Sequence, residues 1–259
     1  MATTDALRQR IVDGTIAFGE RVLPPFERWI ARQSPVGDAT FFDTSLFAWI
    51  APLEENWRII RSELDAVLER REDLPNFQDI STDQLELTTD DNWKTYFFFG
   101  YGFRSEANCA RCPRTTELLE RIPGMKTAMF SVLSPGKHIP AHRGPYKGVL
   151  RYHLGLKIPE PRAGCRLRVG EEVRHWEEGG SLLFDDTFEH EAWNDTDGVR
   201  VVLFIDVVRP LRFPASALNG AVLKAIGVSP FIQDAKRRHN AWERRFEALK
   251  AGRDQPPHR

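Results

Sequence analysis

The 259 residues are enough to bury at least one full hydrophobic core, and a content of 41% hydrophobic and 11% aromatic residues excludes a generally disordered chain. A formal net charge of -1 argues against nonspecific binding to nucleic acid. No apolar run approaches the roughly 20 residues that cross a bilayer, and the N-terminus lacks a basic region followed by an apolar stretch. Three cysteines are too few for a disulfide framework, which fits a reducing compartment. Together these features predict a cytoplasmic protein without a transmembrane segment.

Residues 1–90 are expected to form a helical region that packs on the rest of the chain. Apolar residues recur at roughly helical spacing between residues 5 and 33, with interruptions at Gly14 and Pro24. A clearer amphipathic helix begins near Asn56 and ends before Pro75. Residues 72–92 are acidic and lack a period, which predicts a surface loop.

Residues 91–212 are expected to form a β-rich core. The run from Trp93 to Phe99 is aromatic and β-branched, which predicts a strand buried on both faces, and a short helix is expected from Thr115 to Arg121. Further strands are expected at residues 127–133, 149–158, 165–169, 181–184 and 200–208. Short strands at this spacing predict an antiparallel sandwich or barrel, and no glycine-rich phosphate loop or dinucleotide fingerprint is present.

Residues 213–259 are expected to form a helical extension. The segment from Asp234 to Lys250 has the pattern of an amphipathic helix, and residues 234–259 contain eight Lys or Arg residues against four acids. The plain interpretation is a solvated helix face. Weak contact with anionic lipid or with a partner is the alternative.

Five of the seven histidines lie between residues 138 and 190, and two of them, His142 and His190, stand where loops meet strands. Imidazole binds iron, zinc, copper and nickel, and two histidines from separate strands of a barrel can converge on one ion. Arg200, flanked by valines, adds a buried cation on the following strand. The pattern predicts a metal site with an anion site beside it, although a lone histidine in a sheet is more often structural. We expect His138 and His175 at the surface.

These motifs resemble the aspartyl/asparaginyl β-hydroxylases, a family of iron(II)- and 2-oxoglutarate-dependent oxygenases. The resemblance covers roughly Trp93 to Pro210 and includes Phe130-Ser131-Val132-Leu133, His142-Arg143-Gly144-Pro145, Arg151-Tyr152-His153-Leu154-Gly155-Leu156, Trp176-Glu177-Glu178-Gly179, Phe184-Asp185-Asp186-Thr187-Phe188-Glu189-His190 and Arg200. Parts of it, such as Cys112-Pro113-Arg114-Thr115-Thr116, are also similar to bacterial lipid A acyl-chain hydroxylases.

The resemblance implies a mainly β fold with flanking helices, namely a double-stranded β-helix of the jelly-roll, cupin-like type. It implies that His142 and His190 bind Fe(II) and take part in catalysis, with O2 and the cosubstrate 2-oxoglutarate at the open coordination positions. The residues expected to hold the far end of 2-oxoglutarate are Arg200, Ser131 and His153. A guanidinium suits a carboxylate because it gives two parallel charge-assisted hydrogen bonds. His153 could equally be a core histidine.

Arg151 lies two residues before His153 and is therefore expected on the same strand face. We expect it to bind a substrate carboxylate, with a structural ion pair as the alternative. The usual third iron ligand, a carboxylate two residues after the first histidine, is replaced by Gly144, so water is expected there. Asp186 is a minor alternative ligand, because neighbours of His190 on its own strand point to the opposite face.

The first substrate expected from the resemblance is the β-carbon of an aspartyl or asparaginyl residue in a peptide or small amino-acid derivative. The absence of a carboxylate at Gly144 favours it over the alternative, an acyl chain of a lipid such as lipid A or an ornithine lipid. A third possibility, from another class, is a metal-binding jelly roll without redox activity. Cys109 and Cys112 are interpreted as two reduced thiols, since tetrahedral zinc needs more ligands.

Overall fold

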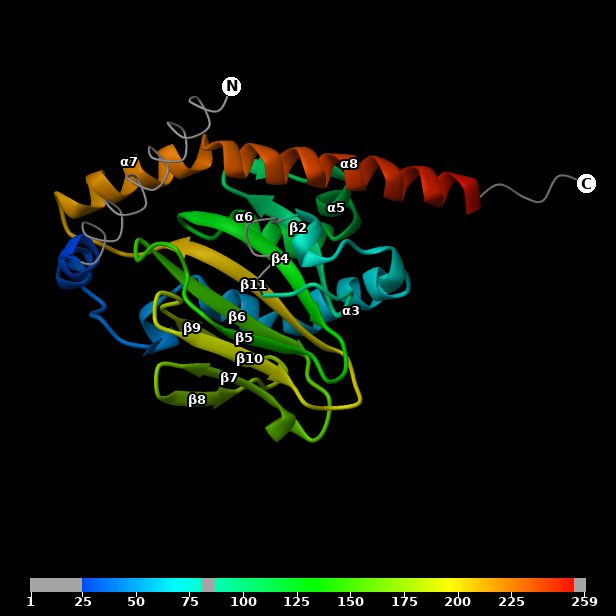
Figure 1. The fold of residues 1–259 in the computed structure, drawn as a ribbon, viewed down its shortest axis with the longest axis horizontal. Coiled ribbons are helices and arrows are strands. Elements are labelled where there is room, and N and C mark those ends of the chain that lie inside the picture. The colour runs from blue at the N-terminus through cyan, green and yellow to red at the C-terminus, as the bar shows by residue number, and fades with distance from the viewer. Residues whose placement is uncertain (1–24, 81–86, 254–259) are drawn as a thin grey trace, which may run out of the picture.

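The computed structural model describes residues 25–80 and 87–253 (Figure 1), and the exposure of side chains is described as far as residue 245. The part of the first expected helix before residue 25 lies outside the described residues. Residues 25–33 are helical. The helices that follow are α2 (Ile50–Glu55), α3 (Trp57–Leu68), α4 (Phe77–Ile80), α5 (Glu106–Arg111), α6 (Pro113–Glu120), α7 (Ala215–Gly227) and α8 (Pro230–Arg253), with short 3-10 turns η1 (Thr44–Leu46), η2 (Arg71–Asp73) and η4 (Arg162–Gly164).

The strands form two antiparallel sheets. The larger has the order β1 (Phe41–Phe42), β9 (Ser181–Phe184), β6 (Val149–Lys157), β11 (Arg200–Val208), β4 (Met125–Leu133), β2 (Trp93–Gly100) and β3 (Phe103–Arg104). The smaller has the order β5 (His138–His142), β10 (His190–Asn194), β7 (Cys165–Val169) and β8 (Glu172–His175). From β4 to β11 the chain passes back and forth between the two sheets, which is the topology of a double-stranded β-helix. The expected fold class is confirmed.

The large sheet is buried on both of its faces. Residues Val201, Leu203 and Ile205 of β11 belong to a hydrophobic cluster shared with α3 and α6. The alternating residues Val202 and Phe204 belong to a second cluster shared with the small sheet. Because successive side chains of a strand point to opposite faces, this division separates a helix-covered outer layer from the barrel interior. It explains why these strands read as unbroken apolar runs.

Three strands of the small sheet have no counterpart among the expected elements. β8 is exposed along its whole length, and β10 alternates buried with half-buried residues. β5 contains Pro140, which is tolerated because β5 is an edge strand of its sheet. Polar composition and proline therefore concealed these strands from a search for apolar runs.

The prediction of a surface loop over residues 72–92 is wrong for much of that stretch. η2 and α4 form within it, and Leu74, Phe77 and Ile80 are buried. The ring of Phe77 stacks on Trp93 with centroids 3.9 Å apart. These apolar side chains are too few to create a visible period, but they anchor the segment to the barrel. Residues 81–86 lie outside the description.

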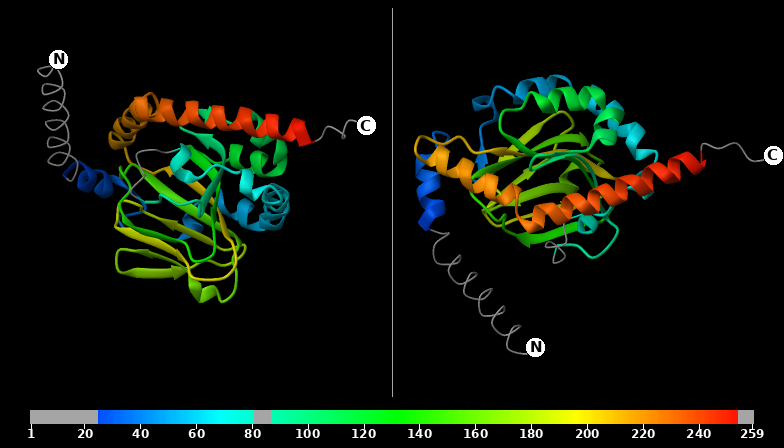
Figure 2. Two further views of the ribbon diagram at one scale, coloured as in Figure 1. Left: turned by 45° about the vertical axis from the view of Figure 1, so that its right-hand side comes forward. Right: turned by 90° about the horizontal axis from the view of Figure 1, so that it is seen from above.

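Helices α7 and α8 run one after the other along a single side of the molecule (Figures 1 and 2). In the described chain no single helix has the length and apolar character needed to span a membrane. By length and composition alone, α7 and residues Pro230–Arg245 of α8 meet that requirement as a pair bent by 51°.

Candidate active site

Two histidines meet inside the barrel where β5 ends and β10 begins. His190 stands directly opposite His142 in the strand register, and their ring centroids lie 4.1 Å apart. The Nδ1 atom of His142 is 2.8 Å from the carbonyl oxygen of Pro140, and that of His190 is 3.0 Å from the carbonyl oxygen of Phe188. If each Nδ1 donates to its carbonyl, each Nε2 keeps its lone pair for a metal ion. We call these two residues the imidazole pair.

The imidazole pair is held in the neutral form that metal binding requires. Burial lowers the pKa of His190 to about 3, with further lowering by His142 and Arg151. Burial also lowers the pKa of His142. Among the described residues no group of three or more His, Cys, Asp or Glu side chains is arranged as a metal site. The donor set that fits a metal ion here therefore consists of two neutral imidazoles.

The Asp186 carboxyl occupies the space into which a side chain at position 144 would extend. A Cβ atom at Gly144 would lie only 2.2 Å from Oδ2 of Asp186, and the Gly144 amide donates to the Asp186 carbonyl oxygen at 2.7 Å. The Asp186 carboxyl is buried, which raises its pKa to about 7 although Arg151 opposes the shift. The Asp186 carboxyl, from the loop between β9 and β10, thus fills the space where a side chain at position 144 would begin, and it pairs with Arg151.

Arg151 forms two ion pairs. It contacts Oδ2 of Asp186 and Oδ1 of Asp206, each at 2.9 Å, with its side chain 17% exposed. The structure therefore has the ion pair that the sequence left as an alternative to substrate binding. Glu189 and Glu191, as expected for neighbours of His190, point away from the imidazole pair and both contact Arg168.

A second set of polar side chains in the barrel interior makes few hydrogen bonds with the described residues. Arg200 is 1% exposed and has no ion pair with any acid in the described chain, and its guanidinium carbon lies 4.5 Å from the ring centroid of Trp176. Within that same part of the chain, Nε and Nη1 of Arg200, both ring nitrogens of His153 and Nε1 of Trp176 are buried without a hydrogen-bond partner. Ser131 is also buried and accepts a hydrogen bond from Trp93 at 3.1 Å. We call Arg200, His153, Trp176 and Ser131 the Arg200 cluster.

The Arg200 cluster fits an anion. Burial lowers the pKa of Arg200 to about 10, and burial followed by Arg200 lowers the pKa of His153 well below its usual value. A buried charge without a partner costs several kcal/mol, so a carboxylate at this place would remove a large penalty. The strand register puts Ser131 beside Val202, two residues along β11 from Arg200, and His153 beside Phe204.

The sequence comparison agrees with this geometry. A sequence model of the aspartyl/asparaginyl beta-hydroxylase family matches residues 54–210, which is more than half of the chain. The chain belongs to this family. It is therefore a hydroxylase, and the family expected from the motifs is confirmed.

Relatives within and near the family differ in how much of their length is matched. The chain is 49% identical over 226 residues to the ornithine lipid ester-linked acyl 2-hydroxylase of Rhizobium tropici, covering 87% of this chain and 80% of that protein. It is 35% identical over 177 residues to the human aspartyl/asparaginyl beta-hydroxylase, covering 66% of this chain and 22% of that protein. A cupin 2 conserved barrel domain protein from Salinispora arenicola aligns with a TM-score of 0.31 and 11% identity, over 54% of this chain and 92% of that one.

Trp176 belongs to one of the hydroxylase motifs, but its place in the site could not be predicted from the sequence. Trp176 is 1% exposed and completes the Arg200 cluster. Its motif follows the exposed strand β8, and no spacing relates it to Arg200, so only the closed barrel brings them together. His138 and His175 are exposed as expected, and His138 pairs with Glu191 at 3.1 Å.

A buried ion network, which we call the Asp185 cluster, joins the two loops that flank the imidazole pair. Asp185 is fully buried between Lys147, 3.0 Å away, and Arg209, 2.6 Å away. Lys147 belongs to the loop after His142, and Asp185 to the loop before His190. Asp185 also accepts hydrogen bonds from the amide and hydroxyl of Thr187. The network fixes both loops to the end of β11.

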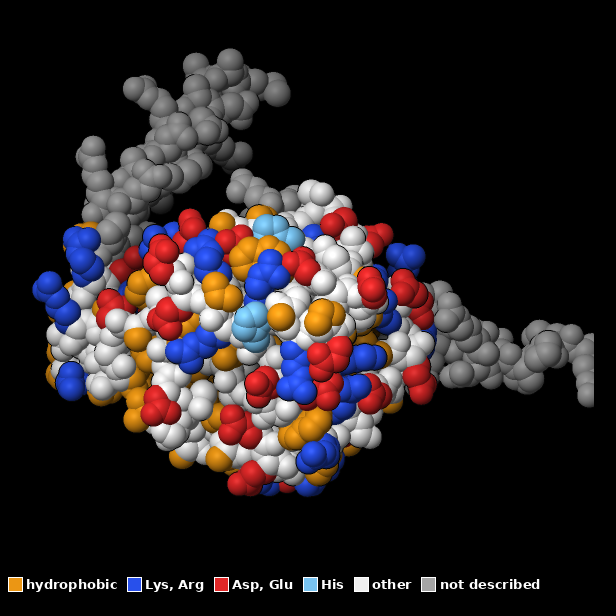
Figure 3. Space-filling view, turned by 90° about the horizontal axis from the view of Figure 1, so that it is seen from below, with side chains coloured by type: hydrophobic (Ala, Val, Ile, Leu, Met, Phe, Trp, Pro, Cys, Tyr) orange, Lys and Arg blue, Asp and Glu red, His pale blue; other side chains and the backbone are white. Residues whose placement is uncertain are grey.

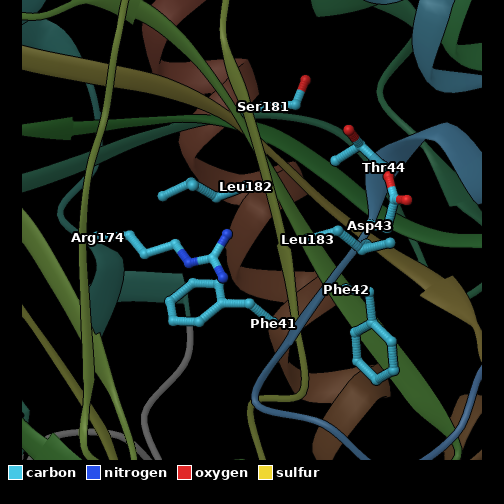
Figure 4. A pocket seen from close by; sticks show the side chains of 8 residues that line it. All are labelled: Phe41, Phe42, Asp43, Thr44, Arg174, Ser181, Leu182 and Leu183. Atoms are coloured by element: carbon cyan, nitrogen blue, oxygen red, sulfur yellow. The ribbon is translucent and has the colours of Figure 1, made fainter.

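A separate hollow of about 380 Å³ lies at the β1 and β9 edge of the large sheet (Figure 4). Arg174 lies over the ring of Phe41 at 4.5 Å, and the wall continues through Asp43, Thr44 and residues 181–183. None of the predicted site residues lines this hollow.

Proposed function

We propose that this hydroxylase uses Fe(II), 2-oxoglutarate and O2 to hydroxylate a methylene group next to a carbonyl in an ester-linked lipid acyl chain. The observation that carries the cosubstrate is Arg200, a buried cation without an acidic partner in the described chain, in the same barrel as two neutral imidazoles. The substrate class is supported by the 49% identity to the Rhizobium tropici enzyme over most of both chains.

The two substrate classes share one chemical feature. Carbon 2 of an ester-linked acyl chain is bonded to the ester carbonyl, and the β-carbon of an aspartyl or asparaginyl residue is bonded to the carbonyl of its side chain. In both, the target is a methylene group beside a carbonyl oxygen that can accept hydrogen bonds. One barrel can therefore serve both classes if the surroundings of the carbonyl change.

Each residue has a separate task in this proposal. His142 and His190 would hold Fe(II) through Nε2, and Asp186 would hold Arg151 beside them. Arg200 would bind the far carboxylate of 2-oxoglutarate, with Ser131, His153 and Trp176 around it. When bound, iron and cosubstrate supply the oxidation: 2-oxoglutarate loses CO2 to give succinate, one oxygen atom of O2 enters succinate, and the other enters the C–H bond.

The lipid substrate now precedes the peptide substrate that the sequence favoured. The peptide preference was based on the absence of a carboxylate at position 144, whereas the lipid substrate is supported by the 49% identity to the Rhizobium tropici enzyme over 87% of this chain. The peptide candidate keeps the support of the family match over residues 54–210. Arg151 would approach the substrate from beside Asp186 in either case.

The test begins with the cosubstrate. Anaerobic addition of Fe(II) and 2-oxoglutarate to the purified protein should produce the weak visible charge-transfer band of the chelate, and Arg200→Met should require a far higher 2-oxoglutarate concentration. A protein that retains zinc and gives neither the band nor succinate would be a metal-binding jelly roll without redox activity.

The second step identifies the acceptor. An ornithine lipid with an ester-linked acyl chain and an aspartyl-containing peptide are each incubated with the loaded enzyme under 18-O2. The lipid should gain 16 mass units, or 18 with the isotope, at carbon 2. Product only from the peptide would return the peptide β-carbon to first place.

A further inference from the structure

Helix α7 presents an apolar stripe to the solvent. Phe213 before the helix is 83% exposed, Leu218 is 45% exposed and Val228 after the helix is 70% exposed. The residues exposed along the same helix at intervals of four are Ala217, Ala221 and Ala225. These six residues form what we call the α7 outer face. Water-exposed apolar residues gathered in one stripe, rather than scattered singly, indicate a contact surface.

Basic residues flank the α7 outer face. Between residues 212 and 245 there are seven Lys or Arg residues and two acids, an excess of five positive charges. All seven are exposed: Arg212, Lys224, Lys236, Arg237, Arg238, Arg244 and Arg245. Of the two acids, Asp234 pairs with Arg237 and Arg238, and Glu243 accepts a hydrogen bond from Ser105. Both helices lie on the same side of the molecule, so the charges and the stripe can meet one surface (Figure 2).

The face beneath β7 and β8 has a different character. There acidic and basic side chains are interspersed (Figure 3), and ion pairs such as Arg166 with Asp195 and Arg168 with Glu189 balance them. The combination of an apolar stripe with unbalanced positive charge thus distinguishes the α7 side.

The inner face of α7 is bonded to the active-site loop. Asn219 is fully buried, accepts a hydrogen bond from the Tyr146 hydroxyl at 2.7 Å and donates to the Gly148 carbonyl at 2.9 Å. Leu223 packs with Tyr146 and Val149 in a small hydrophobic cluster. Tyr146 lies four residues after His142. Whatever contacts the outer face of α7 is therefore held beside the loop that carries one half of the imidazole pair.

We propose that the α7 outer face and its basic flank dock on the surface of an anionic lipid bilayer. The apolar stripe would enter the boundary between headgroups and acyl chains, and the basic residues would contact anionic headgroups. The inference rests on the proposed lipid substrate for its purpose, since it would bring the enzyme to the membrane with the loop after His142 near the bilayer. Its physical basis, exposure and charge, is independent of the reaction.

The experiment measures flotation of the full chain with vesicles. Wild-type protein should bind vesicles of mixed phosphatidylglycerol and phosphatidylcholine, bind pure phosphatidylcholine far less, and lose binding as salt rises from 0.1 to 1 M, where the screening length falls from about 10 to 3 Å. An outer-face variant, Phe213→Ser with Leu218→Ser and Val228→Ser, should bind about tenfold more weakly or worse. The matched control replaces three exposed apolar residues elsewhere: Leu46→Ser, Ile59→Ser and Val173→Ser, which are 61%, 41% and 49% exposed.

The outcomes separate docking from catalysis. Failure of the wild-type protein to float with anionic vesicles, or equal losses in the outer-face and control variants, overturns the docking surface. A change of the outer-face variant from dimer to monomer with unchanged flotation overturns it too, because the face would then join two copies. Flotation as expected without oxidation of any acyl ester leaves docking in place and removes the proposed function. Thermal melting checks folding, and Phe213→Ser alone replaces the triple variant if that variant unfolds.

Discussion

The imidazole pair and the Arg200 cluster occupy one barrel but differ in how far the protein itself satisfies them. Each histidine of the pair has a ring nitrogen within hydrogen-bond distance of a backbone carbonyl, at 2.8 and 3.0 Å. The Arg200 cluster instead keeps several buried nitrogens that no described residue bonds. The hydrogen bonds of the imidazole pair orient the two rings before a ligand binds. The buried nitrogens of the Arg200 cluster remain available to donate hydrogen bonds to a ligand. Under the proposed function, the difference predicts that the metal ion is retained between turnovers and that the carboxylate is exchanged.

Removing one imidazole should have the largest effect. His190→Ala leaves one protein nitrogen for the metal, so succinate formation from 2-oxoglutarate should fall at least about a thousandfold, beyond the 10–100-fold expected for an outer-shell partner. The measurement is succinate release together with iron content. His138→Ala, in the same sheet but exposed, serves as the control. Retained turnover with full iron occupancy would remove His190 from the site.

Substituting Arg200 should move affinity and stability in opposite directions. Arg200→Met removes the partner of a carboxylate, so KM for 2-oxoglutarate should rise about 30- to 1,000-fold. It also removes a buried charge without an acidic partner among the described residues, so the metal-free variant should be about 1–4 kcal/mol more stable to unfolding than the wild type. Urea unfolding without ligand and steady-state kinetics test the two halves. A destabilised variant would mean that Arg200 already has its counter-charge.

Filling the space at Gly144 should disturb the metal end without touching the imidazoles. In Gly144→Ala the new Cβ would collide with Asp186, costing about 1–3 kcal/mol of stability and weakening iron binding by about tenfold. Asp186→Gly in the same chain removes the obstacle, so the double variant should be more stable than the sum of the single changes predicts. Additive effects would show that the two positions do not share a volume.

Lowering the pH should weaken the metal-free fold through the imidazole pair. The folded pKa of His190 is about 3, below its unfolded value near 6.5, so the stability it contributes is complete above pH 6.5 and is lost as pH falls toward 3. The slope is at most about 1.4 kcal/mol per pH unit for one such group.

Comparison with His190→Gln isolates this contribution from Asp186. The raised pKa of that carboxyl acts in the opposite direction, because acid relieves its buried charge. Unfolding temperatures between pH 7 and 4.5 should fall less steeply in the variant. Equal slopes would mean that His190 is solvated.

The sequence predicted those parts of the fold whose signal is local. β7, β9 and β11 match their expected bounds, and β6 matches within one residue, because buried strands read as apolar runs between turns. β8 and β10 escaped because their polar residues do not form such runs. Residues matched to motifs, such as His142 and Arg200, were likewise available from the sequence alone.

Nonlocal contacts were the part that could not be predicted. The place of the Asp186 carboxyl over Gly144 depends on a loop that is 42 residues away in the chain and is fixed by the Asp185 cluster. The packing of Trp176 against Arg200 depends on closure of the barrel. Neither follows from a spacing, since each is decided by where two loops or strands come to rest against each other.

Under the proposed function, the Asp185 cluster also bears on how the protein would bind iron. Because Lys147, Asp185 and Arg209 tie the ligand-bearing loops together through the protein's own charges, the ion is not needed to assemble them. Binding of iron then adds to stability only by mass action, about 2.7 kcal/mol when the free ion is at 100 times its dissociation constant. Under the proposed function, the metal-free chain is expected to stay folded when iron is scarce and to need no refolding when iron returns.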